Sequence, residues 1–246
     1  MLNKLKLSII TVVKNDRQNI EKTILSVISQ NIELEYIVID GGSIDGTLDI
    51  INKYEDKIDI LISEKDDGIY DAMNKAVKLA SGKWICFMNS GDTFFNQNSI
   101  KELFEKADKK ADIIYGDNEI RYLNKSKIIR GKKIGKIWQG MVFSHQSCFV
   151  KKEILVLQPF NIKNAITADY ELFYNLYKNK YVFNYVSVIV SSISAGGVSD
   201  IKRIDSIVSR WNILPKSFKI NVYYLNLIIC EMMKIVVKLF IKRVKS

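Results

Sequence analysis

Acidic residues, amides and glycines gather in a few short segments that could bind a phosphorylated ligand. Residues 37–47 form the densest of these, in which Asp40 closes an apolar run and Gly41 follows directly. Glycine lets a ligand approach the backbone closely, and the N–H groups at a helix N-terminus favour an anion. An ordinary strand-to-helix loop capped by Asp45 is the alternative. This much glycine and acid together favours a ligand site.

A second segment, residues 89–92, follows another apolar run and contains Asn89, Ser90, Gly91 and Asp92. A carboxylate in such a place can hold Mg²⁺ or Mn²⁺, which prefer oxygen ligands and bridge to phosphate oxygens. The same four residue types also favour a β-turn, and taken alone the segment would be read as one.

The third segment, residues 63–75, contains a glycine hinge followed by polar residues at the start of a helical pattern. Asp71 and Asn74 could there contact a ribose, a phosphate or a base. Equally, these side chains could form a solvated helix face, with early acids that match the helix dipole.

Candidates for proton chemistry lie in the second half of the chain. Asp169 and Glu171 begin a helical pattern, so either could be a general base or could satisfy the helix dipole. His145, the single histidine, could be a metal ligand, a proton relay or a structural residue. Gly196 and Gly197 belong to a loop that could close over a site or form a plain turn.

The first ~115 residues alternate strand and helix patterns, which predicts parallel strands joined by right-handed crossovers. We expect strands at 5–13, 36–39, 58–62 and 84–88, and helices after Asn15 or Asp16, after Asp45 and over 69–80. Ligands of such sheets bind beyond the carboxyl ends of the strands. Asn15, Asp40 and Asp92 should therefore lie on one rim.

The remainder of the chain is more mixed in pattern. We expect strands at 112–115, 146–150 and 181–191, a helix at 169–178, and a long amphipathic helix from about 217. Seven Lys/Arg in 216–246 accompany the single acid Glu231. Its uncharged run of eleven residues is shorter than the roughly 20 that a bilayer span needs. We therefore predict a basic helix lying on an anionic membrane surface, with packing on the protein or on a partner as the alternative.

Composition narrows the function classes. The chain has 246 residues, 48% of them hydrophobic and 26% charged, which suits one α/β domain with an appendage. Three separated cysteines and the lack of an apolar leader predict a cytoplasmic location. The sequence contains no Gly-Lys-Ser/Thr phosphate loop, no Gly-x-Gly-x-x-Gly and no nucleophile elbow. Its basic stretches lack interleaved aromatics, so we expect no nucleic-acid partner.

Taken in order, these segments resemble glycosyltransferase family 2, the inverting enzymes of the GT-A fold, and particularly bacterial enzymes that build surface polysaccharides. The similarity runs from Ser8 to about Ser199. It is carried by 8–15, 38–47, 63–75, 89–92, the His145 segment, 168–171 and 196–199.

The resemblance implies roles for individual residues. Thr11 and Asn15 match the first nucleotide-binding loop, and Asp40 matches an acid near the nucleobase. Asp92 matches the metal-binding end of the Asp-x-Asp motif, and Asp169 matches the catalytic base. Gly41, Asp71, Asn74, Ser90 and Gly91 complete the expected nucleotide-sugar contacts, with Asn89, His145 and Glu171 as auxiliaries. Two positions depart from the family pattern: Gly41 stands where many members have a second acid, and Asn89 and Gly91 replace the upstream acids of the metal motif.

The resemblance further implies an α/β GT-A domain over 1–215, with a mostly parallel central sheet. Its 1–115 half would bind the nucleotide sugar and its 116–215 half the acceptor, and 216–246 would form the helical tail. The implied reaction uses Mn²⁺ or Mg²⁺ and moves a sugar from a nucleotide-diphosphate donor to a saccharide or lipid-linked saccharide acceptor, at the inner face of the cell membrane. A non-catalytic sugar-nucleotide-binding relative and a sugar-nucleotide pyrophosphorylase-like enzyme are the alternatives.

Overall fold

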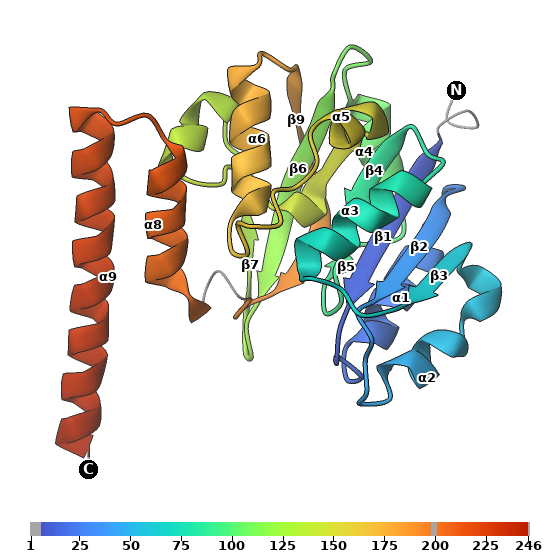
Figure 1. Ribbon diagram of the computed structural model, residues 1–246, viewed down its shortest axis with the longest axis horizontal. Coiled ribbons are helices and arrows are strands. Elements are labelled where there is room, and N and C mark those ends of the chain that lie inside the picture. Colours follow the sequence, from blue (N-terminus) through green and yellow to red (C-terminus); the bar gives the residue numbers. More distant parts are fainter. Residues whose placement is uncertain (1–5, 198–200, 246) are drawn as a thin grey trace.

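The structure, a computed structural model, describes residues 6–197 and 201–245, with side chains described as far as Val237. One sheet runs through the molecule and helices cover both of its faces (Figure 1). The strands are β1 (Leu7–Val13), β2 (Glu35–Asp40), β3 (Ile60–Ser63), β4 (Trp84–Phe87), β5 (Thr93–Phe94), β6 (Ile113–Arg121), β7 (Ser126–Ile129), β8 (Cys148–Lys151) and β9 (Phe183–Ser194). The α-helices are α1 (Ile20–Ile28), α2 (Thr47–Asn52), α3 (Ile69–Leu79), α4 (Ser99–Lys106), α5 (Lys152–Leu157), α6 (Ala168–Lys178), α8 (Arg203–Ile213) and α9 (Phe218–Lys245).

The strand order is β3-β2-β1-β4-β8-β6-β9-β5, with β7 paired to β6. The four strands of the N-terminal half are parallel to one another, as predicted. Beyond β4 the sheet turns mixed, because β8 is antiparallel to both β4 and β6 while β6 and β9 are parallel. The predicted α/β class is thus confirmed, with most of the parallel pairing in the first half of the chain.

Alternate residues of the strands feed two cores, one on each face of the sheet. On one face α3, α5 and α6 pack over Ile10, Ile39 and Ile85. On the other face α1, α2 and α4 pack over Ile9 and Val38. All seven residues of β1 are buried, which is why its sequence is a continuous apolar and β-branched run.

The predicted start of the first helix is wrong by several residues. Instead of beginning after Asn15 or Asp16, α1 begins at Ile20, and its preceding residue Asn19 makes no side-chain capping bond. The backbone carbonyl of Asp16 accepts the N–H groups of Asn19 and Ile20. The side chain of Asp16 accepts Asn19 Nδ2–H on Oδ1 at 2.7 Å, and its Oδ2 makes a contact described below.

The C-terminal region forms two helices rather than one. The helix α8 was not predicted, and it packs against both α6 and α9 at the end of the molecule far from β3 (Figure 1). The tail helix α9 buries Tyr224 completely and partly buries Ile220, Leu227 and Ile228 against the core. Its far half projects past the body of the protein (Figure 1).

Candidate active site

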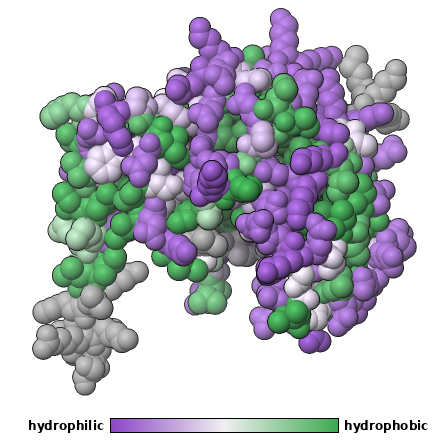
Figure 2. All heavy atoms as spheres, in the orientation of Figure 1, coloured by the Kyte–Doolittle hydropathy of each residue, from purple (hydrophilic) through white to green (hydrophobic). Residues whose placement is uncertain are grey.

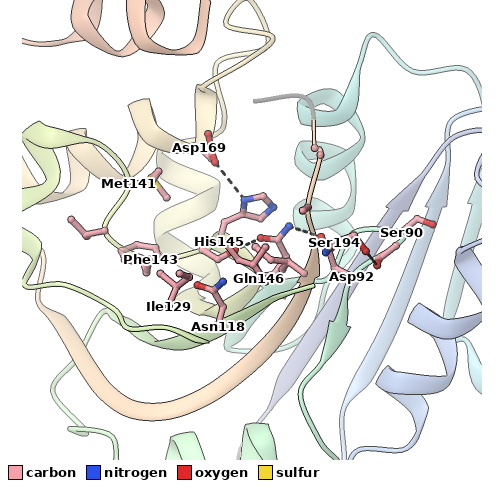
Figure 3. A pocket seen from close by; sticks show the side chains of 18 of the residues that line it. Ser90, Asp92, Asn118, Ile129, Met141, Phe143, His145, Gln146, Asp169 and Ser194 are labelled. Carbon is pink, nitrogen blue, oxygen red and sulfur yellow. Dashed lines mark hydrogen bonds and ion pairs between the residues drawn. The ribbon is translucent and has the colours of Figure 1, made fainter. Parts of the chain in front are cut away.

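A pocket of about 570 Å³ lies where the carboxyl end of β4 meets the segment before β8, the start of α6 and the end of β9. Ser90, Gly91, Asp92, His145 and Asp169, all predicted from the sequence, line this pocket. Figure 3 shows Asp169 and His145 on one side of it and Asp92, Ser90 and Ser194 on the other.

Asp92 is held by donors from two distant segments. Its Oδ2 accepts the Nε2–H of Gln146 at 2.6 Å, and its Oδ1 accepts the backbone N–H of Ser194 at 2.9 Å (Figure 3). Burial raises the pKa of the Asp92 carboxyl above its usual value, and these hydrogen bonds offset only part of that effect. The charged form of Asp92 is therefore costly for the protein until a cation or further donors reach it.

The backbone around Asp92 is braced by Arg121 and Thr23. The guanidinium of Arg121 donates to the carbonyl of Gly91 at 2.9 Å and to Thr93 Oγ1 at 2.8 Å. The hydroxyl of Thr23 donates to the carbonyl of Asp92 at 2.7 Å and accepts the N–H of Gly91. A turn fixed at both sides holds its carboxylate in one direction.

Asp169 occupies the first turn of α6 and receives three donors. Burial alone would raise the pKa of its carboxyl, but His145, the backbone N–H of Tyr170 and the hydroxyl of Tyr70 together hold the pKa below the usual value. The Nδ1 of His145 lies 3.4 Å from Asp169 Oδ2. Asp169 is thus a carboxylate at neutral pH, able to accept a proton.

Two of the three acids that line the pocket, Asp92 and Asp169, have pKa values shifted in opposite directions by their surroundings. Asp92 has a raised pKa and Asp169 a lowered one. Titratable pairs whose environments push their pKa values apart commonly divide acid, base and binding roles between them. In this pocket Asp169 is therefore held as a carboxylate, whereas burial disfavours the charged form of Asp92.

The structure brings a second set of predicted residues together, beside β1 and β2. Asn15 adopts φ 51°, its Oδ1 accepts the N–H of Ile44 at 2.9 Å, and its own N–H donates to Ser43 Oγ. The buried Asp40 accepts Ser43 Oγ–H and, at 2.6 Å, Ser63 Oγ–H. Asn15 and Asp40 thus share Ser43 as a common partner.

Gly41, directly after Asp40, is tightly enclosed. A Cβ atom on Gly41 would lie 2.2 Å from Asp66 Oδ2, so a side chain there would displace the Asp66 carboxylate. The close approach predicted for this glycine is made by a side chain of the protein itself.

Four predicted contacts lie away from the pocket. Thr11 is wholly buried, and its hydroxyl donates to the carbonyl of Met88 at 2.8 Å. Its side chain therefore has no surface to offer a nucleotide, which corrects the expected nucleotide contact of this side chain. Asn74 exchanges two hydrogen bonds of 2.9 Å with the backbone of Phe160. Asp71 pairs with Lys75 at 3.1 Å.

Glu171, the fourth, accepts hydrogen bonds from Asn161 and Asn164. It lines a separate polar pocket of about 650 Å³ beside α8. Only one of the two acids at the start of α6 therefore faces the candidate active site.

Several pocket residues were missed by the sequence reasoning. Asp16 was considered only as a helix cap, yet its Oδ2 accepts the hydroxyl of Ser90 at 2.7 Å. Gln146 follows His145 directly, which was a usable signal. Arg121 and Arg130 lie in residues 121–136, a stretch with seven Lys/Arg and no acid, and Arg130 lines the pocket.

Known structures with this fold define the class of protein. The Pyrobaculum calidifontis mannosyltransferase PcManGT in complex with GDP-Man and Mn²⁺ superposes with a TM-score of 0.65 at 16% identity, covering 89% of this chain and 68% of that one. S. aureus TarS residues 1–349 in complex with UDP-GlcNAc gives 0.64 at 17% identity, covering 85% and 65%. The chain spans 39% of the longer TarS structure. The fold is that of the GT-A glycosyltransferases.

Sequence comparison gives the family. The profile of glycosyl transferase family 2 matches residues 8–168, and the chain belongs to this family of glycosyltransferases. A Mycobacterium bovis PGL/p-HBAD biosynthesis glycosyltransferase is 28% identical over 176 residues, 68% of each chain. A Bacillus subtilis protein, TuaG, whose name places it in teichuronic acid biosynthesis as a glycosyltransferase, is 36% identical over 100 residues, 39% of this chain and 40% of that one.

Proposed function

We propose that this protein is an inverting glycosyltransferase that moves a sugar from a nucleotide-diphosphate donor to an acceptor hydroxyl, with a lipid-linked saccharide of surface polysaccharide synthesis as the acceptor. The observation that carries the proposal is that Asp169, with three donors that lower the pKa of its carboxyl, lies in the same pocket as Asp92. A single displacement requires one general base, for which we propose Asp169, and a cation on the leaving group, for which we propose Asp92 as the ligand.

In this mechanism Asp169 accepts the proton of the acceptor hydroxyl as that oxygen bonds to the anomeric carbon. The bond between this carbon and the nucleoside diphosphate oxygen breaks, so the configuration at the carbon inverts. A general base contributes about 10²–10⁴-fold to such a step. The pocket rim formed by Gly196 and Gly197 lies where it would shield the reacting centre from water; Val198 and Ser199 lie outside the described residues.

A divalent cation, Mn²⁺ or Mg²⁺, fits this donor set when a diphosphate is bound. Among the described residues no cluster of three or more His, Cys, Asp or Glu side chains could hold an ion unaided. Asp92 accepts two hydrogen bonds on its two oxygens, which leaves further lone pairs for a cation. Mg²⁺ commonly uses one or two carboxylates together with substrate phosphates. Bound there, the ion would neutralise the charge that develops on the leaving diphosphate.

The remaining assignments are parts of the same proposal. Residues 1–115 bind the donor, with the Asn15–Asp40 cluster beside its nucleobase. Residues 116–215 bind the acceptor. Ser90 and Gly91 contact the diphosphate. The division falls within β6, so both halves share one sheet.

Turnover tests the proposal directly. The protein is incubated with Mn²⁺ and a panel of nucleotide sugars, with and without a membrane lipid extract, and nucleoside diphosphate release is measured. We expect release with one donor, its loss in EDTA, and a product of inverted anomeric configuration by NMR. Release from no donor would leave a non-catalytic sugar-nucleotide binder, and a product of retained configuration would contradict the single displacement.

We further propose that α9 binds an anionic membrane surface, which places the enzyme peripherally on the inner face of the cell membrane. One apolar face of this helix is exposed to solvent. Its side chains are 41–64% exposed, and they are Val222, Leu225, Ile229, Met232 and Val236. Figure 2 shows hydrophobic residues gathered over the upper part of this helix. Lys234 pairs with Glu231 at 2.8 Å. The structure does not describe the side chains of the last part of this helix, which include Lys238, Leu239, Lys242 and Lys245.

A spanning helix is the alternative mode of membrane contact. Of the described helices, only Phe218–Val237 is long and apolar enough to cross a bilayer, with a mean hydropathy of 1.5, a test that core helices of soluble proteins also pass. Ile229→Glu with Val236→Glu should abolish co-sedimentation with anionic vesicles. Val156→Glu with Leu157→Glu, an exposed apolar pair on α5, is the matched control. Equal binding by both variants would refute interfacial binding through this face.

A further inference from the structure

Three elements far apart in the sequence bring an amide, an imidazole and a carboxylate into one row. Asn89 follows β4, His145 begins the short 3₁₀ helix that precedes β8, and Asp169 lies in the first turn of α6. The Nε2 of His145 lies 3.0 Å from Asn89 Nδ2, and its Nδ1 lies 3.4 Å from Asp169 Oδ2. Figure 3 shows the ring of His145 pointing to Asp169 across the pocket.

The chemistry of the two ends fixes the hydrogens of the ring. An ionised carboxylate only accepts, so Nδ1 of His145 must carry a hydrogen to bond Asp169. With its NH₂ group turned toward the ring, as the structure has it, Asn89 donates to Nε2, and Nε2 then presents its lone pair. A neutral imidazole with its hydrogen on Nδ1 satisfies both partners at once.

In this arrangement His145 has no ring nitrogen available to bind a metal. A histidine binds a metal through the lone pair of a neutral ring nitrogen. The lone pair on Nε2 accepts from Asn89, and Nδ1 has no lone pair to offer while it donates to Asp169. Both nitrogens are committed within the protein.

The contact also gives Asn89 a role of its own. Within the described structure its side chain makes one hydrogen bond, to His145, while its buried Oδ1 has no partner. An aspartate at this position, as in the acidic motif that the family resemblance implies, would present only acceptors to Nε2. The amide is what allows the Nδ1–H form of a neutral ring.

We infer that His145 is a positioning residue for the proposed base: Asn89 selects the Nδ1–H tautomer of His145, and that tautomer orients the carboxylate of Asp169 toward the acceptor hydroxyl. The inference rests on the proposed function in naming Asp169 as the base. Nothing in it requires His145 to exchange a proton with substrate. A carboxylate turned away from its productive direction loses rate, and a misplacement of about 1 Å can cost 10²-fold.

Because His145 is the single histidine, NMR can observe its tautomer without assignment ambiguity. Protein labelled with ¹⁵N-histidine, free of any histidine tag, is recorded at neutral pH. We expect Nδ1 to resonate as a protonated nitrogen and Nε2 as an unprotonated one, with that preference weakened in Asn89→Ala, where only Asp169 still favours the Nδ1–H form. A ring protonated on Nε2 in the wild type would overturn the inference, whether or not any variant folds.

Kinetics supply the second test. His145→Ala should lower kcat about ten- to hundredfold while KM for the donor and the metal concentration for half-maximal rate stay unchanged. His145→Asn, whose amide can replace the Nδ1–H donor, should recover most of kcat. A raised metal requirement, or no rescue by asparagine, would contradict positioning. Wild type without turnover would instead count against the proposed function, while the NMR result would still decide the tautomer.

Discussion

Asp92→Asn should stabilise the metal-free protein near neutral pH while removing turnover. Burial raises the pKa of Asp92, so the folded protein prefers a neutral group at this position. Asparagine supplies one and keeps an oxygen for the N–H of Ser194. Its NH₂ then meets the donor of Gln146, which costs one hydrogen bond of about 0.5–1.5 kcal/mol.

The pKa is raised even with both hydrogen bonds in place, so the net effect of Asp92→Asn at neutral pH should be a gain in stability. At this chain length each ~1 kcal/mol of such a gain corresponds to about 2–4 °C in Tm. The sign follows from linkage. An unfolded aspartate titrates near pH ~3.9, and a raised folded pKa means that the stability contributed by Asp92 is complete below that pH and is lost as the pH rises through the folded pKa. The advantage of Asp92→Asn should therefore be small near pH 4 and full at neutral pH.

The assay is thermal unfolding in EDTA across this pH range. Asp112→Asn is the control with the opposite sign. Although burial opposes it, the ion pair with Lys151 at 2.7 Å and the N–H of Val182 lower the pKa of Asp112, so this variant should lose stability at neutral pH. With Mn²⁺ and a nucleoside diphosphate at 100 Kd the wild type should gain about 2.7 kcal/mol, and Asp92→Asn little. A Tm for Asp92→Asn below that of wild type at neutral pH, or a difference independent of pH, would refute the reasoning.

Three further outcomes are expected. Gly116→Ala would place a Cβ 2.5 Å from the carbonyl of Val188 and 2.6 Å from Val190 Cγ2, so it should cost about 1–3 kcal/mol in thermal unfolding; an unchanged Tm would show that β6 and β9 can separate locally. Tyr224 is fully buried and donates to a backbone carbonyl, so Tyr224→Phe should cost about 0.5–1.5 kcal/mol and Tyr224→Ala about 3–5; equal losses would contradict the burial. Because the pKa of Asp169 is lowered, kcat at a Mn²⁺ concentration that is saturating at every pH should stay constant with falling pH through the usual carboxyl range and drop only below it; an acid limb near neutral pH at saturating Mn²⁺ would contradict that environment.

The first half of the fold was predictable because its strands are buried on both faces and its helices carry single apolar stripes. β1, β2 and β4 lie where their apolar runs predicted them. The second half was harder because its pairing mixes parallel and antiparallel strands and is non-local. The register of β6 with β8 and β9 depends on partners 30 or more residues away, which no local pattern records. α8 was missed although Ile204, Ile207, Val208 and Trp211 stand at the i, i+3, i+4, i+7 spacing of an apolar helix stripe, so the signal for this helix was present in the sequence.

The same difference between local sequence patterns and tertiary contacts decides which site residues could be predicted. Asp92 and Asp169 were identified by residue type and position, and both line the pocket. Thr11 was not separable from a ligand-facing residue, because the direction in which a side chain leaves a fully buried strand depends on what packs above it. Gln146 and Ser194 become partners of Asp92 only when β8 and β9 join the sheet. Such contacts belong to the tertiary structure alone.

The central claim, that Asp169 is the base of a sugar transfer, is tested most directly by Asp169→Asn measured beside Glu153→Gln. Both acids are the second residue of a helix, in α6 and α5, and only Asp169 lines the pocket. With the active donor and Mn²⁺, Asp169→Asn should lower kcat by about 10²–10⁴-fold with unchanged nucleoside diphosphate affinity, while Glu153→Gln turns over like wild type. Nucleoside diphosphate release by Asp169→Asn at the wild-type rate would contradict the account.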